Sequence, residues 1–102
     1  MTNAQNIRNT IAQLTREKWK LEPALKEAKK QNKRAYDGVI DWEEAYMASG
    51  EVEEIGQKLD KAYDEYNKVN EAMCKTEKQV EAIKEALEAL RNAAEAIEWL
   101  GL

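Results

Sequence analysis

The sequence predicts an all-α fold, namely a long antiparallel two-helix coiled-coil hairpin that turns at residues 48–51. First, its 102 residues are 43% hydrophobic and 35% charged, with one Pro and no Phe, a composition typical of long helices. Second, apolar residues recur at steps of three and four on both sides of the midpoint. Third, the stretch Ala48-Ser49-Gly50-Glu51 interrupts this pattern at the midpoint. We expect one domain over residues 1–102.

The first helix is expected over residues 3–48. Thr2, with Gln5 three residues on, fits a capping box in which both side chains bond to free backbone N–H groups. The heptad places Ile11 at position a and Leu14 at position d, and the pattern keeps its phase to Tyr46. The inward residues are Ile7, Ile11, Leu14, Lys18, Leu21, Leu25, Ala28, Asn32, Ala35, Val39, Trp42 and Tyr46.

Pro23 lies inside this run and has no N–H to donate to the carbonyl of Trp19. We expect a kink near Pro23 rather than a helix end, because the heptad keeps its phase and Pro23 falls at the outward f position. The alternative is a separate helix that begins with Glu22 as its cap.

The second helix is expected over residues 51–100. Gly50 favours a left-handed ending of the first helix, and Ser49 is a suitable cap for the second. Glu51, Glu53 and Glu54 would occupy the first turn, and Gly101 would end the helix. The inward residues are Val52, Ile55, Leu59, Ala62, Tyr66, Val69, Met73, Thr76, Val80, Ile83, Leu87, Leu90, Ala94 and Ile97.

The two patterns fit one another when the chain folds between residues 50 and 51. Each a or d residue of the first helix then meets one of the second, in pairs whose numbers sum to 101, such as Trp42 with Leu59. Two inward residues carry an amide or a charge: Asn32 faces Val69, and Lys18 faces Ile83. A buried polar residue usually fixes the register of a coiled coil, so Asn32 and Lys18 are predicted to set it.

The flanks of the seam are expected to lack ion pairs. Facing e residues, taken as pairs whose numbers sum to 99, include Arg8 with Arg91 and Glu22 with Glu77, which repel. A second row of small residues follows positions c and g of the second helix. We expect this row to form the seam of a homodimer, a four-helix bundle. Alternatively, alanine is simply a good helix former on a solvated face. The row comprises Ala82, Ala86, Ala89, Ala93, Ala96 and Leu100.

An apolar strip near the turn consists of Tyr36, Ile40, Met47 and Tyr63, and acidic residues surround it. Such a patch suits a basic protein partner, although the tyrosines could equally just cover the seam. Trp19 and Trp99 point outward by the heptad. Exposed tryptophans often mark a contact, so both are candidate interface residues.

Charge is segregated along the chain, whose net charge is −4. Residues 8–34 carry nine Lys and Arg against three Glu, and residues 37–65 carry ten Asp and Glu against two Lys. The basic residues could track phosphates, so a nucleic-acid-binding arm is the alternative function. The acidic half disfavours it. The basic strip comprises Arg16, Lys20, Lys26, Lys29, Lys30, Lys33 and Arg34.

Catalytic chemistry has few candidates here. The chain has no His, its one thiol is Cys74, and no inward position carries Asp or Glu. We therefore expect no catalytic residues, no metal or cofactor and no small-molecule substrate. No apolar run reaches the ~20 residues of a membrane span, and the N-terminus lacks a signal sequence. We expect a cytoplasmic, non-enzymatic protein-interaction module: an adaptor, a small inhibitor or regulator, or an assembly factor.

Overall fold

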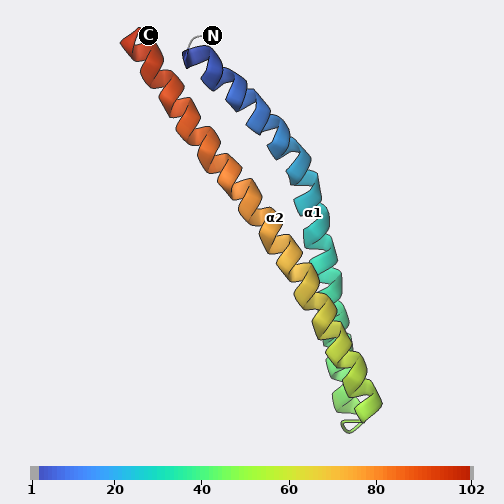
Figure 1. The fold of residues 1–102 in the computed structure, drawn as a ribbon. Coiled ribbons are helices and arrows are strands. Elements are labelled where there is room, and N and C mark those ends of the chain that lie inside the picture. Colours follow the sequence, from blue (N-terminus) through green and yellow to red (C-terminus); the bar gives the residue numbers. More distant parts are fainter. Residues whose placement is uncertain (1–2, 102) are drawn as a thin grey trace. The chain divides into compact units, whose positions relative to one another are not determined.

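Two long helices make up the computed structural model, which describes residues 3–101. Helix α1 spans Asn3–Ala48 and helix α2 spans Glu53–Leu100. Figure 1 shows them joined by one short turn, and residues 3–101 contain no strand. The predicted all-α helical hairpin is confirmed. Thr2, the first residue of the expected capping box, lies outside the described residues.

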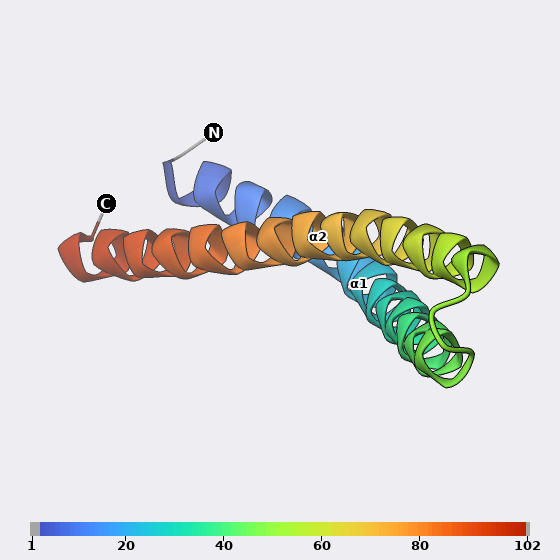
Figure 2. The same ribbon diagram turned by 90° about the horizontal axis from the view of Figure 1, so that it is seen from below.

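The turn between the helices is built as expected at Gly50, which has a left-handed φ of 76°. The N–H of Ser49 donates to the carbonyl of Ala45 at 3.0 Å, and the N–H of Glu51 donates to that of Tyr46 at 3.0 Å. These bonds satisfy carbonyls of the last turn of α1. Figure 2 shows the turn from below.

Helix α2 begins two residues later than predicted, at Glu53. Glu51 belongs to the turn, because its φ of 66° is left-handed. Val52 is the cap, since its carbonyl accepts from the N–H of Gly56 at 3.0 Å. Ser49 acts one step earlier: its Oγ donates to the carbonyl of Tyr46 at 2.8 Å and accepts from the N–H of Val52 at 3.3 Å. The expectation of Ser49 as the cap and Glu51 in the first helical turn was wrong.

Pro23 lies inside α1 without ending it. The alternative of a separate helix capped by Glu22 is therefore wrong. A proline removes one hydrogen bond and leaves the rest of the helical ladder in place, so packing on both sides can keep the helix continuous. The expected kink stays a prediction.

The described chain divides into two compact units. The tip unit is Leu25–Lys75, and the terminal unit consists of residues up to Ala24 together with residues from Thr76 onward. In each unit a segment of α1 packs against a segment of α2. The most buried side chains are Val39 in the tip unit and Val80 and Leu87 in the terminal unit.

The predicted inward residues form this packing. From Ile7 to Ile97, every predicted a and d residue is partly or fully buried except Val52. Val52 is 45% exposed because it precedes the first turn of α2 instead of lying within it. The heptad therefore identified the seam correctly along both helices, with one error at the cap.

Contacts in the tip unit agree with the predicted register. The ring of Tyr36 lies 5.7 Å from that of Tyr66, and the ammonium of Lys58 lies 5.2 Å from the ring centre of Trp42. The residue numbers sum to 102 for Tyr36 and Tyr66 and to 100 for Trp42 and Lys58. Both sums lie within one of the predicted value of 101, so these contacts are consistent with the predicted register.

The flank pairing was predicted incorrectly. Arg8 pairs with Glu98, at 3.6 Å, instead of facing Arg91, and the e residues Glu43 and Tyr63 also bond across the seam. In both pairs the residue numbers sum to 106, whereas the predicted sum was 99. Each of these e residues of α1 therefore reaches a residue of α2 that lies one heptad beyond the predicted partner. An e residue lies between two e residues of the other helix, and the a and d layers do not determine which one it reaches.

Candidate functional site

The flank of the tip unit nearest the turn carries the most distinctive surface of the molecule. We call it the tip flank. It consists of the e and b positions of the two helices between residues 36 and 63. Its members are Tyr36, Ile40, Glu43 and Met47 from α1, with Glu53, Gly56, Asp60 and Tyr63 from α2.

A hydrogen bond joins the two helices across this flank. The hydroxyl of Tyr63 donates to Oε1 of Glu43. This bond raises the pKa of Tyr63 above its usual value, and partial desolvation and the negative charge of Glu43 raise it further. Ionisation of the phenol would break the bond and place two negative charges together. The bond therefore favours the protonated hydroxyl of Tyr63, which donates to the carboxylate of Glu43.

Aromatic and aliphatic side chains continue the flank along α1. Tyr36 packs on Tyr66 with an angle of 53° between the rings, and half of its surface remains exposed. Ile40 is partly buried, and Met47 is 78% exposed. The four predicted residues Tyr36, Ile40, Met47 and Tyr63 thus occupy e and b positions of one flank. Tyr36 and Tyr63 each contact a residue outside this strip, namely Tyr66 and Glu43.

A groove of about 330 Å³ lies on the tip flank. It is smaller than the groove of about 430 Å³ in the terminal unit. The base of the tip-flank groove is Gly56. A Cβ at this position would lie 3.1 Å from Cε2 of Tyr46, so glycine allows the ring to approach α2. The lining residues are Tyr46, Glu53, Gly56, Gln57, Leu59 and Asp60.

The tip flank is acidic. Glu43, Glu53 and Asp60 lie on it, and no Lys or Arg occupies an e or b position between residues 36 and 63. The adjoining f positions add Asp37, Glu44 and Asp64. Carboxylates in and around this groove produce a negative potential that attracts cationic groups.

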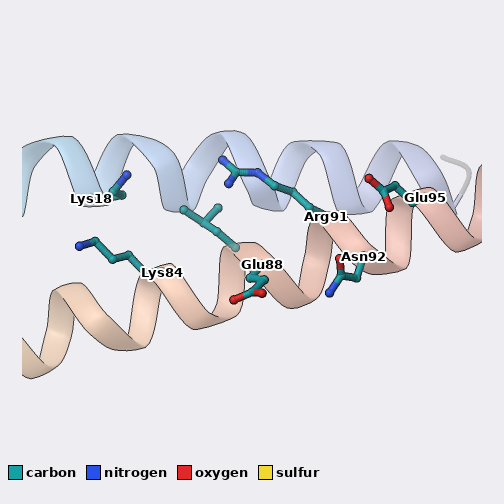
Figure 3. Close-up of a pocket in the computed structure, with 7 residues that line it drawn as sticks. Lys18, Lys84, Glu88, Arg91, Asn92 and Glu95 are labelled. Carbon is teal, nitrogen blue, oxygen red and sulfur yellow. The ribbon is translucent and has the colours of Figure 1, made fainter.

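The groove of the terminal unit is of a different kind. Figure 3 shows Arg91 extending toward α1, whereas Glu88 and Asn92 point away from it. The ammonium of Lys18, partly buried, pairs with Glu22 at 3.4 Å, and that of Lys84 pairs with Glu81 at 3.7 Å. Nearby carboxylates therefore offset the cations. The lining residues are Lys18, Lys84, Leu87, Glu88, Arg91, Asn92 and Glu95.

The predicted register residues differ in their partners. Nδ2 of Asn32 donates to Oδ1 of Asn70 at 3.1 Å, across the seam of the tip unit. Sequence reasoning missed Asn70 as its partner, because the layer pairing placed Val69 opposite Asn32. Lys18 directs its ammonium to Glu22 of its own helix, so its polar contact does not cross the seam.

The predicted interface residues of the terminal unit are largely exposed. Trp99 is 91% exposed, and Trp19 is also exposed. The alanine row is exposed at Ala82, Ala89, Ala93, Ala96 and Leu100 and partly buried at Ala86.

The basic strip is also exposed at each of its seven residues. Arg16 and Lys20 belong to the terminal unit, and the other five residues belong to the tip unit. Cys74 is an exposed free thiol.

Gly56, Tyr46 and Glu43 were not among the predicted site residues. A comparison of both possible e pairings would have indicated Glu43, because the pairing one heptad along places it opposite Tyr63. Within residues 3–101, no cluster of three or more His, Cys, Asp or Glu is arranged to hold a metal ion. Neither helix has an apolar stretch of the length and hydropathy that crossing a bilayer requires.

Comparison with protein-family models, with curated proteins and with solved structures gives no match for this chain.

Proposed function

We propose that this chain is a non-enzymatic protein–protein interaction module, which acts in the cytoplasm as an adaptor, a small inhibitor or regulator, or an assembly factor. The observation that supports it is the exposure of large apolar side chains on helical surfaces. Trp99 and Met47 are 91% and 78% exposed, and Tyr36 and Tyr63 are exposed on the same tip flank as Met47. Side chains of these types are enriched where proteins bind one another.

The module is also proposed to be a homodimer. The exposed row from Ala82 to Leu100 offers small side chains, which allow close approach of a second helix. Sedimentation at tens of micromolar measures this directly. A single species of 11.7 kDa would contradict the dimer.

The partner test is a capture experiment from the source cell, followed by reciprocal capture with the purified, identified partner. We expect Trp99→Ser or Met47→Ser to weaken the captured complex at least tenfold, because each removes an exposed apolar contact. Gln13→Ser, at an exposed polar position of α1 outside the tip flank, is the control and should leave binding unchanged. Unchanged binding in all variants would contradict the proposed surfaces.

A nucleic-acid-binding arm is the contrasting function, and charge reversal separates the two. Lys29→Glu, Lys30→Glu and Lys33→Glu together would abolish a salt-dependent shift with RNA or DNA if the basic strip binds phosphates. The protein-interaction module predicts no such shift in the unmodified chain at low ionic strength.

A further inference from the structure

We propose that the tip flank docks a basic amphipathic helix of a protein partner, with an apolar side chain of that helix seated in the groove against Tyr46 and Leu59. This inference rests on the proposed function and specifies the partner for one of its surfaces. Its basis is the coincidence of a groove, exposed apolar side chains and unbalanced negative charge on one flank.

The groove accounts for the apolar part of the partner. Tyr46 and Leu59 contribute apolar surface to its lining, and the ring of Tyr46 lies over Gly56, where a Cβ would otherwise stand. Met47 and Tyr36, at b and e positions of α1 on the same flank, expose further apolar surface. A helix can lay its apolar face along such a surface, with anchors spaced three and four residues apart.

The charges account for the basic part of the partner. Glu43, Glu53 and Asp60 surround the apolar surface without a Lys or Arg on the same e and b positions. Of these, Glu43 accepts from a neutral phenol and keeps its negative charge uncompensated by a cation. Lys or Arg side chains at the edge of the docked helix would therefore meet carboxylates on both sides.

The length of the flank indicates the size of the docked segment. Residues 36–47 of α1 span roughly 18 Å at the helical rise of about 1.5 Å per residue. A partner helix of about three turns covers this distance. Such a helix would lie beside both helices of the tip unit, as a third helix against two.

The test uses the full chain and a labelled amphipathic peptide of about 14 residues that contains only Leu and Lys at helical spacing. Oligolysine of the same length tests charge alone, and a Leu/Glu peptide tests apolar binding alone. Fluorescence anisotropy measures affinity at several salt concentrations. We expect the Leu/Lys peptide to bind at least tenfold more tightly than either comparison peptide. Equal binding of oligolysine would overturn the proposal.

Matched variants locate the binding surface. We expect Glu43→Gln, Glu53→Gln and Asp60→Asn together to weaken peptide binding at least tenfold and to reduce its salt dependence. The control changes the same net charge at exposed Glu71, Glu77 and Glu85, and it should alter affinity less than twofold. Equal weakening by both sets would overturn the proposal, because it would indicate attraction to net charge only.

A second pair of variants tests the apolar contact. Met47→Ser should weaken binding, and Leu100→Ser, at a residue of similar exposure in the terminal unit, should not. Neither side chain is buried, so both variants should fold. Equal affinity of Met47→Ser and the unmodified chain would overturn the docking of the apolar face on this flank.

The basic strip of a second copy is the competing occupant. If the three tip substitutions abolish self-association in sedimentation, the flank belongs to that copy and the proposal is overturned. Absence of Leu/Lys peptide binding to the tip flank can be distinguished from failure of the proposed function. A partner still captured through Trp99 would preserve the interaction module, whereas a monomeric chain with no captured partner would contradict it.

Discussion

Glu51 has a backbone conformation that favours glycine. Its φ of 66° costs an ordinary residue about 1–2 kcal/mol relative to glycine, because Cβ crowds the following carbonyl. Its side chain is exposed. We therefore expect Glu51→Gly to stabilise the fold by about 0.5–1 kcal/mol in urea unfolding, after the greater freedom of the unfolded glycine is deducted.

Two substitutions serve as controls for Glu51→Gly. Gly50→Ala should lose about 1 kcal/mol, because Gly50 also has a left-handed φ, of 76°. Glu54→Gly should lose a similar amount, since Glu54 is within α2 and glycine weakens a helix. A destabilised Glu51→Gly variant would contradict the importance of backbone strain in this turn.

The bond from Tyr63 to Glu43 predicts a pH dependence. Because it raises the pKa of Tyr63 in the folded chain, the folded state holds this proton more tightly than the unfolded state does. The stabilisation is fully present below the unfolded pKa of about 10, and it is lost as the pH rises through the raised folded pKa.

Absorbance at 295 nm measures the ionisation of tyrosines. We expect Tyr63→Phe to remove a phenol that titrates above the usual range, and Glu43→Gln to move that phenol back toward it. Glu44→Gln changes the same charge without touching the bond, and it should have a smaller effect. An unchanged titration curve in Glu43→Gln would show that the bond does not form in solution.

We propose that the polar contact between Asn32 and Asn70 in the tip unit sets the register of α1 against α2. Replacing both with Leu removes two partly buried amides and adds apolar surface, so the variant should resist urea better. The variant should also populate several registers instead of one. In the unmodified chain a slipped register would leave the Asn32 or Asn70 amide without its partner, and the Leu side chains remove this penalty.

Amide NMR spectra test this loss of register. We expect Asn32→Leu with Asn70→Leu to give more peaks than the chain has amides. Asn67→Leu, the same change at an exposed position, should keep a single set. One set of peaks in the double variant would remove the role of the pair in setting register.

The helices themselves were predictable because their signal is local. A repeat of three and four residues identified the seam from Ile7 to Ile97, and Gly50 located the turn within about two residues. The incorrect predictions concerned the flank pairs and the cap of α2, which depend on side-chain direction and on backbone angles. The heptad could not decide whether Arg8 reaches Arg91 or Glu98, and it could not show that Glu51 is left-handed or that Val52 is the cap.

The candidate site was predictable in part for the same reason. Tyr36, Ile40, Met47 and Tyr63 were placed on one flank by their heptad positions. The groove was not, because it requires the ring of Tyr46 to lie over Gly56. Such a close approach depends on the rotamer of one side chain, which the repeat does not encode.

At the scale of the whole molecule, few of the described side chains are buried. Within residues 3–101, the buried hydrophobic residues are Val39, Val80 and Leu87. A chain of this size usually depends on a larger core for its stability, so association with a second chain would contribute to it.

The proposed dimer would make stability depend on protein concentration. A tenfold increase in protein concentration should then stabilise the folded dimer by about 1.4 kcal/mol and raise its melting temperature by roughly 3–6 °C. Ala89→Glu with Ala96→Glu should abolish this dependence by placing charge in the alanine row. Ala12→Glu, at an exposed alanine of α1 in the same unit, should retain it. A melting temperature that is constant across concentrations in the unmodified chain would contradict dimerisation.

The contact between Tyr46 and Gly56 has a consequence for mutational tolerance. Gly38 and Gly56 both lie inside helices, where alanine is ordinarily better by about 0.5–1 kcal/mol. Space is open around Gly38, whereas a Cβ at Gly56 would meet the Tyr46 ring at 3.1 Å. Gly38→Ala should therefore raise the melting temperature, and Gly56→Ala should raise it only together with Tyr46→Leu. In a library of random variants selected for folding, position 38 should accept many side chains and position 56 should remain glycine.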